Sequence, residues 1–322
     1  MKELACGVDL GGTKLAVGLV KLDGILIDKL VVYDHCINKD EHGTVRVISE
    51  LIRELLKKNG LKEEQLSGIG VGFPGHIRYP DGITITSSNI KGFRNFPLKK
   101  ELESHFKLRV VTDNDANAQA YAEFKYGAGA GCNNMIFVTV SSGVGAGIII
   151  DGKLYRGFSG TAGEFGHMIV DPDGEIRCGC GNYGCLMTYT CGAALGKIFK
   201  RYLVSGMPSK LGLDENVPAG AIDGQVLKRG LEIGDELTKK VVDQCARYMG
   251  IGLYNLFQIL NPALFVLGGG LMNLGDHFFK QIKKNFYTLA DGMMFDEVQI
   301  VLSKLKEDAG IIGAASLLLE EI

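Results

Sequence analysis

The sequence lacks an uninterrupted apolar stretch long enough to cross a membrane. A spanning helix needs about 20 mainly apolar residues, and the nearest candidate, residues 135–150, is broken by Ser141, Ser142 and three glycines. A signal-peptide pattern is also missing, because the chain reaches Asp9 and paired glycines without an apolar core region. We therefore expect a cytoplasmic protein with no membrane partner.

An excess of charge of one sign is missing as well. Lysine and arginine number 35 and aspartate and glutamate 37, which leaves a formal net charge of -2, and no run of five like charges occurs. Surfaces that bind nucleic acid or anionic lipid concentrate positive charge. We therefore expect a small-molecule partner and no nucleic acid.

Two common nucleotide-binding motifs are absent or defective. No GxxxxGK[ST] segment occurs, which argues against a Walker-type NTPase. A GxGxxG pattern does occur at residues 70–75, but Pro74 stands where a helix would have to open. We therefore do not interpret residues 70–75 as a dinucleotide site.

The length of 322 residues and the hydrophobic fraction of 46% predict a globular protein of two domains. A pattern of strand, glycine turn, strand and Asp-Gly turn at residues 4–24 returns at residues 135–154. The repeat indicates two related α/β halves, unless any two glycine-rich hairpins look this similar. Hydrophobic periodicity predicts helices or helical stretches at residues 44–58, 97–106, 223–260, 276–289 and 310–319, with an irregular loop at 73–96.

Glycine is abundant, with 45 residues, about twice the usual share of roughly 7%. Three glycine-rich turns follow predicted strands, at residues 9–13, 139–145 and 268–270. Tight turns without side chains can point several backbone N–H groups at phosphate oxygens. One such turn alone is usually structural, but three favour a nucleotide-binding clamp.

The segment Thr112-Asp-Asn-Asp-Ala-Asn117 places four polar residues where a strand gives way to a helix. Capping the helix would explain one of them. A carboxylate here could accept the proton of a hydroxyl nucleophile, and the amides could hold other hydroxyls of a polyol.

Eight cysteines in a cytoplasmic protein of this size do not indicate a disulfide framework. Cys178, Cys180 and Cys185 fall within eight residues and follow His167 closely. Three cysteines and one histidine match the ligand set of a closed, structural tetrahedral zinc site. The alternative is a glycine-rich loop that happens to hold reduced cysteines.

Four motifs together resemble the ROK family of sugar kinases: DLGGTK at residues 9–14, NDAN at 114–117, GEFGH at 163–167 and CxCGxxGC at 178–185. Their order and spacing match over nearly the whole chain. The resemblance implies two actin-like (ribonuclease H-like) α/β domains with mixed sheets that close over a central cleft. It implies a small domain of residues 1–114 plus 306–322, a large domain of residues 115–305 with the zinc loop, and a homodimer or homotetramer.

The resemblance also implies roles for individual residues. Asp115 matches the catalytic base, and Asp9 lies near the magnesium ion of Mg-ATP. Sugar contacts are implied for Gly75, Asn89, Asn114, Glu164 and His167, and His167 would also bind the zinc through its other ring nitrogen. Contacts to ATP are implied for Asp9, Gly11, Gly12, Thr13, Lys14, Thr139, Ser142, Gly143, Gly268, Gly269 and Gly270.

Two positions depart from the family pattern. Met187 stands where the family usually has a glutamate that binds the sugar near its anomeric end, and Ser141-Ser142 replaces a Gly-Thr pair. The hydroxyl of Ser142 remains available to ATP. Met187 leaves the identity of the sugar open. It suggests a substrate without a free anomeric hydroxyl, unless the substitution is neutral and a nearby polar residue or a water replaces the lost hydrogen bonds.

The activity we expect is phosphorylation of the primary 6-hydroxyl of a hexose or hexose derivative by ATP. Three alternatives stay open. The same family contains transcriptional repressors with a DNA-binding segment ahead of the kinase-like part, but only eight residues precede Asp9 here. The others are a sugar-binding sensor with weak or no catalysis, and an unrelated actin-like ATPase.

Overall fold

The computed structural model describes residues 3–12, 14–33, 40–87, 90, 92–291 and 298–320. The chain packs as two compact units. The first comprises Met1–Phe137, Gly147–Gly163 and Ser303–Ile322, and the second comprises Val138–Ala146 and Glu164–Leu302. The domain boundaries expected at residues 114 and 305 stay a prediction, and each unit is described by itself.

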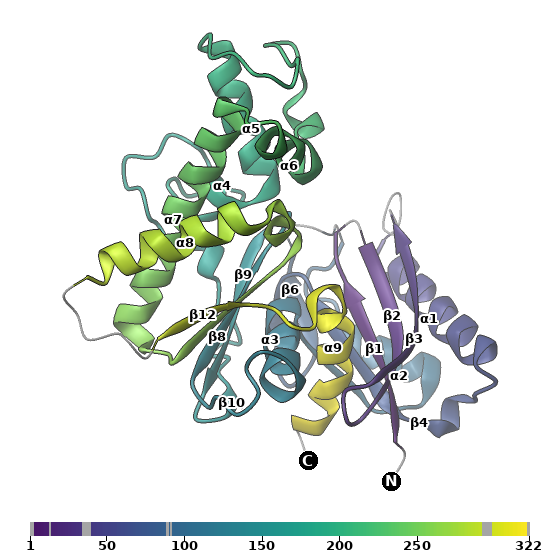
Figure 1. Ribbon diagram of the computed structural model, residues 1–322. Helices are drawn as coiled ribbons and strands as arrows, with labels where there is room; N and C mark the ends of the chain where they lie inside the picture. The colour runs from purple at the N-terminus through teal and green to yellow at the C-terminus, as the bar shows by residue number, and fades with distance from the viewer. Residues whose placement is uncertain are drawn as a thin grey trace. The chain divides into compact units, whose positions relative to one another are not determined.

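The first unit is built on a mixed five-stranded sheet in the order β3-β2-β1-β4-β7 (Figure 1). Its strands are β1 (Leu4–Leu10), β2 (Lys14–Lys21), β3 (Leu26–Tyr33), β4 (Leu66–Phe73) and β7 (Val110–Asn114). β1 runs antiparallel to β2 and parallel to β4, and β4 runs parallel to β7. The segment predicted as an irregular loop contains a short hairpin of β5 (His76–Arg78) and β6 (Ile83–Thr86).

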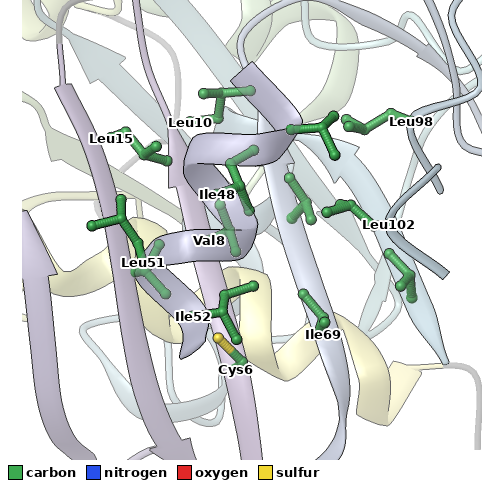
Figure 2. Packing of buried hydrophobic residues seen from close by; sticks show 14 of the residues in the cluster. Cys6, Val8, Leu10, Leu15, Ile48, Leu51, Ile52, Ile69, Leu98 and Leu102 are labelled. Carbon is green, nitrogen blue, oxygen red and sulfur yellow. The ribbon is translucent and has the colours of Figure 1, made fainter. Parts of the chain in front are cut away.

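One face of this sheet packs against α1 (Glu41–Lys58) and α2 (Leu98–Phe106). Alternate strand residues such as Val8 and Ile69 point to this face and meet Ile48 and Ile52 of α1 (Figure 2). The helix begins where the Asp40 side chain accepts a hydrogen bond from Gly43 N at 2.6 Å. The helix predicted from residue 44 thus starts one turn earlier.

The opposite face of the sheet is lined with glycine, and α9 (Ala309–Glu320) lies against it beside α3 (Asp115–Tyr126). A β-carbon at Gly70 would lie 1.7 Å from the Ala314 carbonyl oxygen, and one at Gly7 would lie 2.0 Å from that of Ile311. Backbone therefore packs directly on backbone. Within the GxGxxG pattern at residues 70–75, Gly70 has this packing role, and it lies in β4 between buried Ile69 and Val71.

A second five-stranded sheet has the order β10-β9-β8-β11-β12. Its strands are β8 (Met135–Val140), β9 (Val144–Ile150), β10 (Lys153–Leu154), β11 (Leu264–Gly268) and β12 (Gln299–Leu302). β8 and β9 are the strands of the second repeat, as predicted. β11 and β12 run parallel, whereas β9 and β10 run antiparallel, so this sheet is also mixed.

The second unit carries five helices among its described residues: α4 (Met187–Thr190), α5 (Gly192–Val204), α6 (Gly224–Glu232), α7 (Glu236–Leu260) and α8 (Asp276–Leu289). The helical stretch predicted at residues 223–260 is two helices, because Gly234 has a φ of 65° and ends the first. Asp235 then begins the second by accepting a hydrogen bond from Thr238 N at 2.8 Å. No helix in the described ranges is both long and apolar enough to cross a membrane.

Candidate active site

The carboxyl ends of three parallel strands meet at one edge of the first sheet. Asp9 of β1 lies opposite Gly72 of β4, and Gly72 lies opposite Asp113 of β7. Neighbouring strands are about 4.8 Å apart, so the backbones of Asp9 and Asp113 lie about 10 Å apart. Open α/β sheets bind their ligands at this edge, and the predicted catalytic residues lie on it.

Asp115 and Asn114 lie where β7 ends and α3 begins. The Asn114 side-chain oxygen caps the helix by accepting hydrogen bonds from Ala116 N at 2.8 Å and Asn117 N at 3.3 Å. Its amide nitrogen donates to the Gly75 carbonyl oxygen at 3.2 Å, so two of the residues expected to contact the sugar lie together. The half-buried Asp115 lies in the first turn of α3, close to the backbone of Gly72.

The turn between β1 and β2 is closed by a hydrogen bond from Gly11 N to the Lys14 carbonyl oxygen at 2.8 Å. Gly12 lies in the same turn, and Lys14 begins β2. Burial raises the pKa of Asp9, and the positive charge of Lys14 lowers it in part. Gly310 of α9 packs against the Asp9 carboxylate, where a β-carbon would lie 2.4 Å from Asp9 Cγ.

Two further glycine turns lie together in the second unit. The first follows Thr139 and is closed by a hydrogen bond from Ser141 N to the Gly143 carbonyl oxygen at 2.8 Å. Ser142 lies in this turn and is exposed. Gly269 has a φ of 90°, and a β-carbon there would lie 2.4 Å from the Val140 carbonyl oxygen. The predicted loops at 139–145 and 268–270 are therefore in backbone contact.

The His167 ring lies between the cysteine cluster and Glu164. Its Nδ1 is 3.5 Å from Cys178 Sγ, and its Nε2 is 3.8 Å from a carboxylate oxygen of Glu164. One ring nitrogen thus faces the sulfurs while the other faces the predicted sugar contact. This arrangement is what the two expected roles of His167 require.

The ligand atoms of His167, Cys178, Cys180 and Cys185 all lie within 4.8 Å of one another. A tetrahedral zinc ion with ordinary bond lengths separates two sulfurs by about 3.8 Å and a sulfur from a nitrogen by about 3.6 Å. The observed separations are 3.7 Å between Cys180 Sγ and Cys185 Sγ and 3.5 Å between His167 Nδ1 and Cys178 Sγ. The four donors therefore fit a zinc ion, which stays a prediction.

Met187 begins α4 directly after the cluster, and its side chain is half-buried. Leu186 N donates to the Met168 carbonyl oxygen at 2.8 Å, which holds Met187 on the backbone segment next to His167. Two predicted contact residues, Thr13 and Asn89, lie outside the described residues.

Sequence reasoning missed an ion-pair network beside Asp115. Arg156 Nε donates to Asp113 Oδ2 at 2.7 Å, and the same guanidinium binds the Glu320 carboxylate. Asp113 appeared only as one of four polar residues at a helix start. Nothing in the sequence marks Arg156 as the partner of Asp113, because the two residues lie 43 positions apart.

Comparison with known proteins gives three consistent matches. The sequence model of the ROK family matches residues 5–321. A glucokinase from Halalkalibacterium halodurans is 35% identical over 317 residues, 98% of this chain and 94% of the relative. A xylose repressor from Caldicellulosiruptor bescii is 30% identical over 98% of this chain and 78% of the relative.

A solved structure of a ROK family protein also matches this chain. The crystal structure of a ROK family glucokinase from Streptomyces griseus in complex with glucose and AMPPNP matches with a TM-score of 0.84 and 33% identity, covering 98% of both chains. This match confirms the expected actin-like, two-domain α/β fold class.

Proposed function

The chain belongs to the ROK family, and from that premise we propose that it is an ATP-dependent kinase that phosphorylates a hydroxyl of a hexose or hexose derivative. The observation that carries the proposal is the carboxylate of Asp115 in the first turn of α3, beside the pair formed by Asn114 and Gly75. Glucokinase relatives and a glucokinase structure with glucose and AMPPNP support the choice of sugar and ATP.

In the proposed reaction the oxygen of the sugar 6-hydroxyl attacks the γ-phosphorus of ATP. The bond between that phosphorus and the bridging oxygen breaks, ADP leaves, and the hydroxyl proton passes to Asp115. Asn114 can contribute to sugar binding, because its amide has a second N–H beyond the one given to Gly75. Glu164 and His167 are proposed to bind further sugar hydroxyls.

The glycine turns are proposed to hold ATP. The hairpin with Gly11, Gly12 and Lys14 would offer backbone N–H groups with little steric hindrance, and so would the loops at 139–145 and 268–270. Asp9 would hold a magnesium ion, which uses one or two protein carboxylates together with substrate phosphates. That ion would neutralise charge on the phosphates.

The cysteine cluster is proposed to hold a structural zinc ion. The four protein ligands would fill all four coordination positions of the zinc ion, so none would be left for a substrate. The role of the metal would then be to fix the His167 ring, and so to orient the nitrogen that faces Glu164.

Met187 is proposed to set the preference at the anomeric end of the sugar. A thioether accepts hydrogen bonds weakly and packs well against carbon, so a substrate without a free anomeric hydroxyl would fit better than glucose.

A homodimer or homotetramer is also proposed. The similarity to a xylose repressor makes a sugar sensor with weak catalysis the second candidate.

Replacement of Asp115 by Asn tests the function. The variant keeps the shape of the side chain but cannot accept the proton, and loss of a general base costs about 10²–10⁴-fold in rate. We expect kcat with a panel of hexoses and glycosides to fall at least 100-fold, on the order of the lower figure, while sugar binding measured by calorimetry persists. A variant within a few-fold of wild type, or a wild type without turnover on any sugar, would contradict the proposal.

A further inference from the structure

We propose that Arg156 is a positioning residue for the reaction. It holds Asp113, and through Asp113 it fixes the turn that presents Asn114 and Asp115. The inference rests on the proposed role of Asp115 as the base.

The two oxygens of the Asp113 carboxylate have different partners. Oδ2 accepts from Arg156 Nε at 2.7 Å, and only 12% of the Arg156 side chain and 3% of the Asp113 side chain are exposed. Oδ1 accepts from Asn114 N at 2.7 Å and from Asn117 Nδ2 at 2.9 Å. The carboxylate therefore ties both ends of the turn around Asp115 to the guanidinium.

The guanidinium itself is fixed from two other directions. Its Nη1 donates to Glu320 Oε1 at 2.9 Å and its Nη2 binds the second oxygen of the same carboxylate, an arrangement in which both groups are held in one plane. The Tyr79 ring covers its face, with Cζ 3.9 Å from the ring centroid. Burial disfavours its charge, but the carboxylates of Glu320 and Asp113 outweigh this effect and raise the pKa of Arg156.

The backbone of Arg156 anchors a second part of the proposed site. Its carbonyl oxygen accepts from Ala162 N at 3.0 Å, which closes the loop of residues 157–163. That loop packs on β5, since a β-carbon at Gly160 would lie 2.7 Å from the Ile77 carbonyl oxygen. Along the chain the loop leads to Glu164, so one residue holds both the turn of the base and the start of a sugar-binding segment.

The test compares two changes that break different halves of the network. Arg156→Met removes the support of Asp113, and we expect kcat to fall about 100-fold, the size of effect that a small misplacement of a catalytic group causes, while KM for ATP stays within about twofold. Glu320→Gln leaves the bond between Arg156 and Asp113 in place, so its kcat should stay within about threefold of wild type even if its Tm falls.

A network that serves only to hold α9 would behave differently. The two variants would then lose thermal stability alike, and kcat measured below both melting temperatures would stay near wild type or fall equally in both. Either result overturns the inference. If Arg156→Met does not fold, Asp113→Asn replaces it, and an unchanged kcat in that variant is equally contradictory.

The Asp115→Asn variant is assayed in parallel. An inactive Asp115→Asn protein beside a fully active Arg156→Met protein overturns the positioning role alone. An active Asp115→Asn protein instead overturns the proposed base.

Discussion

Replacement of Gly70 by alanine should detach α9 from the first sheet. Gly70 lies in the centre of β4, and a β-carbon there would lie 1.7 Å from the Ala314 carbonyl oxygen, whereas real β-carbons almost never approach closer than 3.0 Å. The atoms in conflict are backbone atoms of a strand and a helix. The conflict can therefore be relieved only by separating α9 from the sheet.

The cost follows from what α9 buries. Ile311, Ile312, Leu317 and Leu318 are all at most 5% exposed, and full burial of such side chains is worth about 1.5–3 kcal/mol each. A separation of about 0.5–1 Å already forfeits roughly a quarter to a half of the contact energy. The free energy of unfolding should thus fall by about 2–6 kcal/mol, out of a typical total of about 5–15 kcal/mol.

Gly72→Ala is the matched control, two residues along the same strand. Its β-carbon would lie 3.4 Å from Asp115 Cα, an ordinary contact, and alanine is favoured over glycine within a strand by roughly 0.5–1 kcal/mol. Thermal unfolding followed by circular dichroism should show Gly70→Ala melting at least about 5 °C below Gly72→Ala. Melting temperatures within about 2 °C of each other would refute the packing argument.

Three further predictions concern the metal, the specificity and the pH dependence. Elemental analysis should find one zinc per chain. The Cys185→Ser variant should lose zinc and sugar affinity, whereas the control Cys132→Ser, which lies outside the cluster, should keep both. Full activity in zinc-free protein would count against the site. Met187→Glu should raise kcat/KM for glucose relative to kcat/KM for a methyl glucoside. If glucose is already the better substrate of the wild type and the variant keeps that order, Met187 does not set the preference at the anomeric end. Burial disfavours the ionised form of Asp235, but hydrogen bonds from Thr238 outweigh it and lower the pKa of Asp235. Its stabilisation is thus present above about pH 4 and lost as the pH falls through the folded-state value. The stability gap between wild type and Asp235→Asn should therefore close on acidification, and a gap that is constant with pH would contradict this.

The local features of the fold could be predicted from sequence because their causes are local. Short apolar runs next to glycine turns predicted the strands, and the polar segment at 112–117 marked the start of α3. The helical stretch predicted at 223–260 was left undivided because apolar periodicity continues across the break between α6 and α7. Gly234-Asp235, a helix stop followed by a helix start, was the signal that should have divided it.

Contacts between distant parts of the chain could not be predicted in this way. Glu123 is fully buried, and its carboxylate accepts hydrogen bonds from the Ser303 hydroxyl and from Leu305 N, about 180 positions away. Arg156 and Glu320 are similarly separated by 164 positions. In the sequence Glu123, Arg156 and Glu320 are each one charge among many, and their partners are defined only by the packing of the chain.

The glycine face of the first sheet also has a consequence for folding during synthesis. The last strand of that sheet ends at Asn114, whereas the helix that covers its glycines ends at Glu320. Translation at about 5–20 residues per second places roughly 10–40 s between the two. During that interval the nascent sheet presents bare backbone with few side chains to shield it, a surface that other strands or chaperones can reach. The first sheet is therefore synthesised early, but its packing is completed only when α9 has been made.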